Sequence, residues 1–96
     1  MRINKAEIEA LHALYAKQNA YEREWIENYT EDQDRATQAA EKSDAMESVI
    51  LAMVDDLSKT NDKATVWFAN RLLQATSHLS VSRYLKCLEV CGVELI

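Results

Sequence analysis

Residues 46–62 read MESVILAMVDDLSKTND, an apolar repeat followed by a polar run. The first part, up to Leu57, places apolar side chains three and four residues apart, which is the period of an α-helix with one buried face. The polar part, residues 58–62, contains several helix-capping residues and no apolar one, as interhelical turns do. We therefore expect a helix over about 31–58, a turn over this polar part, and another helix that begins near Asp62.

The helix before this stretch has clear signals at its start. Asn4 can cap the helix, and Glu7 stands three residues later to complete a capping box. Ile3 and Ile8 occupy the two positions of a hydrophobic staple. These signals predict a first helix over about 5–29.

Two further connections, one before and one after residues 46–62, separate the helices. Thr30 and Gln33 repeat the capping-box pattern, so we expect the chain to break near Thr30. The third helix runs from Asp62 to a polar connection at about residues 77–80, and its apolar side chains cover more than one face. A helix of this kind lies at the centre of a bundle or meets another chain.

The last helix ends at the only glycine of the chain. Apolar side chains again follow the helical period over about residues 80–91. Gly92 then stands where a left-handed residue closes a helix, and Val93 is placed to fold back on Leu88, as in a Schellman cap.

One glycine, no proline and many strong helix formers exclude a fold built from many strands and turns. We expect a single all-α domain, residues 1–96, built as a small bundle of about four helices, two long and two short. Helices of such unequal length leave the long pair projecting beyond the short pair. We therefore predict a homodimer in which the projecting parts pair across a two-fold axis.

The sequence shows no feature of a secreted or membrane protein. The longest apolar run, Val49 to Val54, is about a third of the roughly 18 residues that cross a bilayer, and no signal-peptide core follows Met1. Cys87 and Cys91 lie four residues apart, a spacing that rarely suits a disulfide, and free thiols fit a reducing compartment. A cytoplasmic location is the expectation.

No pattern in the chain indicates catalysis, a cofactor or a metal. Glu9 and His12 form one E-x-x-H, but a di-iron bundle needs a second copy, and His78 has Ala75 in place of the glutamate. We expect a solvent-facing Glu9 and His12 pair. Zinc needs more ligands than two cysteines, and packing of the last helix explains Cys87 and Cys91 better. A single glycine cannot form a phosphate-binding loop. The chain is predicted not to be an enzyme.

An acidic stretch interleaved with aromatic residues is the first candidate for function. Its candidate partner-binding residues are Tyr21, Glu24, Trp25, Glu27, Tyr29, Glu31, Asp32 and Asp34. Aromatic anchors with a charged rim are typical of protein-binding surfaces, so we expect a protein-binding adaptor or inhibitor. The alternative is that these aromatics are core residues and the acids their solvated edge.

Charge is divided unevenly along the chain, whose net charge is −5. Residues 1–58 hold six basic and 13 acidic side chains, and residues 59–96 hold five basic and three acidic ones. The acidic first part favours a partner with a basic surface and repels nucleic acid.

A second candidate lies in the basic part. Residues 79–93 (LSVSRYLKCLEVCGV) resemble the recognition helix and following turn of winged-helix regulators. The resemblance implies a helix-turn-helix DNA-binding regulator in which one face of helix 80–91 meets the major groove, through Ser80, Ser82, Arg83 and Lys86. Two features depart from the winged-helix pattern: few residues follow Gly92 to form a wing, and the turn before helix 80–91 lacks a glycine.

Overall fold

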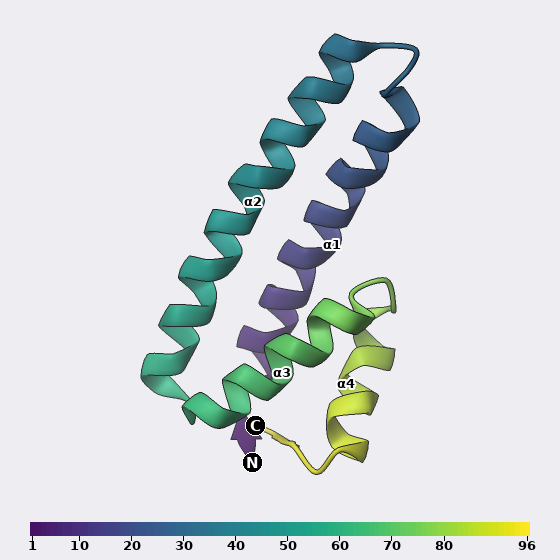
Figure 1. Cartoon of the computed structure of the whole chain (residues 1–96). Helices are drawn as coiled ribbons and strands as arrows, with labels where there is room; N and C mark the ends of the chain where they lie inside the picture. Colours follow the sequence, from purple (N-terminus) through teal and green to yellow (C-terminus); the bar gives the residue numbers. More distant parts are fainter.

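The computed structural model describes residues 1–96 as an all-α chain with four helices and two very short strands. In chain order the elements are β1 (Arg2–Ile3), α1 (Lys5–Asn28), α2 (Gln33–Thr60), α3 (Lys63–Thr76), α4 (Val81–Val90) and β2 (Glu94–Leu95). The predicted number and lengths of the helices are confirmed. In Figure 1, α1 and α2 form a long antiparallel hairpin, and α3 and α4 pack around one end of it. None of the helices combines the length and apolar character that a membrane span requires.

The hydrophobic core lies entirely at the end of the hairpin that α3 and α4 cover. Its 13 buried members are Ile3, Ile8, Leu11, Tyr15, Ile50, Leu57, Val66, Ala69, Leu73, Tyr84, Leu85, Leu88 and Val93. No member comes from residues 16–49, which we call the arm; the rest of the chain is the body. The arm projects beyond the short helices, as predicted, and gives the molecule its extents of 46 × 25 × 17 Å.

Each helix begins at a side chain that accepts a backbone N–H three residues on. These N-caps are Asn4, Asp32, Asp62 and Ser80. The predicted break near Thr30 is confirmed, because α1 ends at Asn28 and α2 begins at Gln33. The cap of α2 is Asp32 and not Thr30 of the capping-box pattern, since the carboxylate of Asp32 accepts the N–H of Arg35 at 3.1 Å. Only one of the two hydrogen bonds of the predicted capping box of α1 forms, the one from the N–H of Glu7 to Oδ1 of Asn4. The N–H of Asn4 donates to Oδ1 of Asn61 at 3.1 Å, and not to the side chain of Glu7.

The turn between α2 and α3 is shorter than predicted. Ser58 to Thr60 continue α2, and the side chains of Ser58 and Lys59 find partners inside the helix. Ser58 Oγ donates to the carbonyl of Val54 at 2.9 Å, and Lys59 pairs with carboxylates one turn earlier. Only Asn61 and Asp62 remain between the two helices.

The two ends of the chain meet in a parallel pair of strands that the sequence did not predict. Arg2 pairs with Glu94 and Ile3 with Leu95. The predicted Schellman cap directs the chain into β2: Gly92 has φ +89°, and the N–H of Val93 donates to the carbonyl of Leu88 at 3.0 Å. Ile3 and Val93 are thereby buried in the core.

Candidate functional site

Small side chains hold the two helices of the arm together. Its only buried residues are Ala36, Ala39 and Ser43, all on α2. Since small residues fill this seam, the large apolar side chains of the arm lie at its edge or outside it. Trp25 is 40% exposed, Ile26 65% and Tyr29 60%. The alternative that the arm aromatics are core residues is therefore wrong for Trp25 and Tyr29.

The predicted acidic-aromatic surface is divided between two flanks of the hairpin. On one flank, the carboxylate of Glu24 accepts from Nε of Arg35 at 2.9 Å, and Nζ of Lys42 lies 5.7 Å from the ring centre of Tyr21. Glu24 raises the pKa of Arg35 through this hydrogen bond and its charge, with smaller charge contributions from Asp32 and Glu27. On this flank the predicted residues Tyr21 and Glu24 face cations of the same chain.

The opposite flank carries the two exposed aromatics. Trp25 and Tyr29 lie edge to face, with ring centres 5.7 Å apart and planes at 75°. An edge-to-face contact of this kind restrains both rings before a partner binds, so that little further entropy is lost on binding, which suits residues that anchor a partner. Trp25 and Tyr29 are thus the predicted site residues that the structure brings together.

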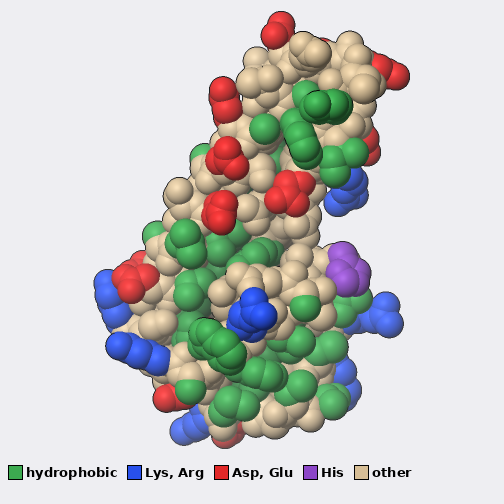
Figure 2. All heavy atoms as spheres, in the orientation of Figure 1, with side chains coloured by type: hydrophobic (Ala, Val, Ile, Leu, Met, Phe, Trp, Pro, Cys, Tyr) green, Lys and Arg blue, Asp and Glu red, His purple; other side chains and the backbone are tan.

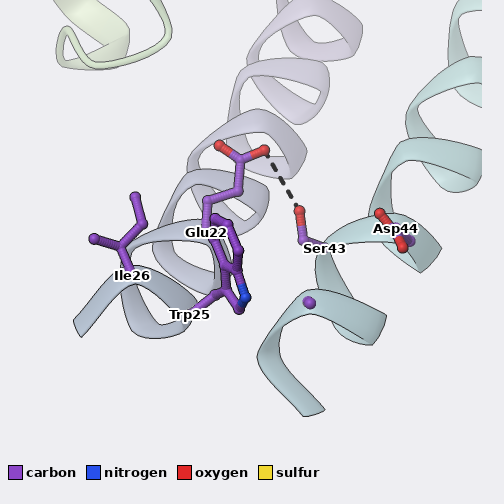
Figure 3. Close-up of a pocket in the computed structure, with 6 residues that line it drawn as sticks. Glu22, Trp25, Ile26, Ser43 and Asp44 are labelled. Atoms are coloured by element: carbon purple, nitrogen blue, oxygen red, sulfur yellow. Dashed lines mark hydrogen bonds between the residues drawn. The ribbon is translucent and has the colours of Figure 1, made fainter. Parts of the chain in front are cut away.

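Two depressions that share Trp25 run along this flank, and together we call them the arm groove. The first, of about 320 Å³, is lined by Glu22, Trp25, Ile26, Ala40, Ser43 and Asp44. The second, of about 380 Å³, is lined by Trp25, Tyr29, Thr30, Gln33, Ala36 and Thr37. Figure 3 shows the indole of Trp25 lying between the two helices, where α2 offers only short side chains.

Two acids, Glu22 and Asp44, line the arm groove, and neither has a cationic partner. Glu22 accepts only a long hydrogen bond from Oγ of Ser43, at 3.5 Å (Figure 3). The sequence interpretation did not select either acid. Helical spacing could have found Glu22, which lies three and seven residues before Trp25 and Tyr29, whereas Asp44 comes from the other helix and carried no signal.

The remaining predicted acids lie near the free end of the arm. Asp32 caps α2, and Glu27, Glu31 and Asp34 are exposed. The arm as a whole holds nine acidic and four basic side chains, so it carries the entire net charge of −5. Figure 2 shows acidic side chains spread along the arm, a hydrophobic cluster near its free end, and most basic side chains of this face around the body.

His12 differs from its predicted position. Instead of facing solvent beside Glu9, it is buried, and its Nε2 donates to the carbonyl of Leu79 at 2.9 Å. Its ring centre lies 5.7 Å from that of Tyr84, so His12 joins α1 to the connection before α4. No group of three or more potential ligands lies close enough to hold a metal ion.

The candidate DNA-binding residues lie on and just before α4. Ser82, Arg83 and Lys86 are exposed, whereas the hydroxyl of Ser80 accepts the N–H of Arg83 at 3.4 Å as the cap of the helix. The chain after Gly92 pairs with β1 in parallel and so forms no antiparallel wing.

No family model, curated protein or solved structure matches this chain. The features that define the site are an all-α body, a projecting acidic arm, and an aromatic groove along one flank of that arm.

Proposed function

We propose that this chain is a non-enzymatic binding protein, an adaptor or inhibitor, whose arm groove occupies a basic surface of another protein. The observation that carries the proposal is the exposure of Trp25, Ile26 and Tyr29 on an arm without a core of its own. Exposed apolar side chains gathered in one place mark interaction sites, and central aromatic anchors contribute most of the binding free energy in many interfaces.

Charge indicates the kind of partner. The arm carries the whole net charge of the chain, and the carboxylates of Glu22 and Asp44 are free of in-chain cations. A basic partner would be attracted from solution and held with the aromatic groove at the centre of the interface and the acids at its rim. We expect its affinity to fall as salt is added, because rim charges are screened.

A second copy of the chain would cover the same groove, as in the predicted homodimer. Pairing two arms of net charge −5 brings like charges together, which favours the basic partner over the second copy. Light scattering at tens of micromolar distinguishes a homodimer from a chain whose groove is free for another protein. A dimer supports the pairing of arms only if Ile26→Gln with Tyr29→Gln dissociates it, and a monomer contradicts the homodimer prediction.

The test is affinity capture from the native host with matched variants. A partner should be retained by the wild type and by Trp67→Gln, an exposed position on α3, and lost by Ile26→Gln with Tyr29→Gln. Glutamine suits a helix, so these exposed changes preserve the fold. Equal capture by all three proteins would contradict the proposal.

Charge reversals sharpen this test. Glu22→Lys with Asp44→Lys should reduce capture more than Glu27→Lys with Glu31→Lys, because the first pair lines the groove and the second does not. The opposite order would move the binding surface to the other flank or to the tip of the arm.

DNA binding through α4 is the alternative, favoured by the exposure of Ser82, Arg83 and Lys86. A gel shift with random duplex DNA at low salt distinguishes the two functions. A shift that disappears in Arg83→Ala with Lys86→Ala would favour the DNA-binding regulator, and no shift is what the binding protein predicts.

A further inference from the structure

We infer that the occupant of the arm groove is a basic amphipathic α-helix of the partner, laid along the seam between α1 and α2. This inference rests on the proposed function and narrows it from a basic protein surface to one kind of secondary structure. Its support comes from the backbone of the arm, the shape of the groove and the charges around it.

The backbone of the arm offers nothing to an extended segment. The groove lies between two helices whose N–H and C=O groups are paired within each helix, and the only strands of the chain, β1 and β2, lie in the body. A segment that enters an apolar groove must satisfy its own backbone polar groups, because the groove cannot. A helix does so, whereas a strand needs an open sheet edge.

The groove has the length and the floor that a helix requires. Along α2 it extends from Gln33 to Asp44, which are eleven positions apart, and at a rise of about 1.5 Å per residue this is roughly 17 Å or three helical turns. Its floor is made by Ala36, Ala40 and Ser43, which recur at helical spacing and allow a third helix to approach closely. Trp25 lies near the middle of this length, where it would contact the central apolar residues of the occupant.

The chain already packs one helix against the neighbouring part of the same hairpin. A further depression adjoins the arm groove at Glu22 and is lined by Ile50 and Leu51 of α2 and by Gln74 near the end of α3. The helix α3 places Val66, Ala69 and Leu73 into the core there, at i, i+3 and i+7. The partner helix would continue this coverage where α3 stops.

All charged residues that line the groove and the depression beside Ile50 are acidic, whereas another depression that shares Glu22 and Ile26 with the groove is lined by Arg23. The acids are Glu22, Asp44 and Glu47, and no lysine or arginine lines the groove or the depression beside Ile50. The matching helix therefore has apolar residues about every third or fourth position on one face and lysine or arginine beside them.

The test uses two synthetic peptides of identical composition as probes. Both contain about 18 residues of leucine and lysine only; one has the helical repeat and the other strict alternation, the period of a strand. The protein is the full chain with Trp67→Phe, which leaves Trp25 as its only tryptophan. We expect saturable binding of the helical peptide with a blue shift of Trp25 emission. The affinity for the alternating peptide should be lower by about tenfold or more.

Matched variants locate the site. Ile26→Gln with Tyr29→Gln should weaken binding of the helical peptide about tenfold or more, while Val90→Gln, exposed on α4, should leave it unchanged. Glu22→Lys with Asp44→Lys should also weaken it, by more than Glu89→Lys does. Circular dichroism of each variant checks that the helices are intact.

Three results would overturn the inference: no saturable binding, equal affinity for both peptides, or binding unchanged by Ile26→Gln with Tyr29→Gln. If host capture still depends on these two positions while the helical peptide does not bind, the proposed function stands and the helical occupant is wrong. If host capture is independent of them too, both are wrong.

Discussion

Replacing Trp25 with alanine should open the arm and leave the body folded. Trp25 is the largest side chain that packs over the seam of the arm, where it lies against short side chains of α2 such as Ala36 and Ala40. The 13 core residues all belong to the body, so nothing in the core depends directly on Trp25. The two parts of the molecule should therefore respond differently to Trp25→Ala.

The buried surface of Trp25 sets the size of this effect. Trp25 is 40% exposed, so of roughly 250 Å² for a tryptophan side chain about 150 Å² is removed from water. At about 25 cal/mol per Å², and allowing for the β-carbon that alanine keeps, the loss is about 3 kcal/mol. Each 1.4 kcal/mol is tenfold, so the equilibrium for opening the arm should rise roughly 100-fold.

Hydrogen exchange resolved by residue measures this directly. In Trp25→Ala, amides between residues 20 and 44 should lose about 100-fold protection, while those of α3 and α4 change little. The exposed control Trp67→Ala should change neither group by a comparable factor. An equal loss of protection in arm and body would refute the independent opening of the arm, because it would mean that the molecule unfolds as one unit. Ile26 and Tyr29 are more exposed than Trp25, so their replacement should cost less stability, which makes them the better positions for binding tests.

Three further predictions concern the body. Asn61→Ala removes the acceptor of the Asn4 N–H and should lower the free energy of unfolding in urea by about 1–2 kcal/mol; an unchanged midpoint would contradict this role. Gly92→Ala should cost about 1 kcal/mol through its φ of +89° alone, since an added β-carbon meets nothing within 4 Å; a loss several times larger would indicate a clash. Tyr84→Phe should cost about 1 kcal/mol at neutral pH, because the hydroxyl donates to the carbonyl of Ala69 at 2.7 Å. Burial raises the pKa of Tyr84 above its ordinary 10.0, so stability should fall as pH rises above that value, and Tyr84→Phe should flatten this fall in urea titrations; equal slopes would contradict it.

The helices could be predicted because their signals are local. Asn4, Asp62 and Ser80 each lie within three residues of the N–H groups that they cap, and Gly92 ends α4 through its own backbone angle. The pairing of β1 with β2 carried no such signal, since two-residue strands at opposite ends of the chain have no periodicity to read. The burial of His12 depends in the same way on a distant carbonyl, that of Leu79.

The site could be predicted in part. Tyr21, Trp25 and Tyr29 are spaced by four residues, which suggests one face, but each such step turns about 40° around the helix. Over two steps the first and last residues move apart, so the seam with α2 falls between them: Tyr21 lies beside Lys42, and Tyr29 lines the groove. Only the packing of α2 decides where that seam runs, and a single sequence does not contain that information.

Site-specific photo-crosslinking in cells of the native host measures directly whether the arm groove binds a basic protein. A photoreactive residue at position 29, on the arm groove, is compared with one at position 90, exposed on α4. Binding through the arm groove predicts a basic protein crosslinked from position 29 and absent from position 90, with a crosslink that weakens when Glu22→Lys and Asp44→Lys are added. The same products from both positions, or a crosslink that the charge reversals leave unchanged, would contradict it.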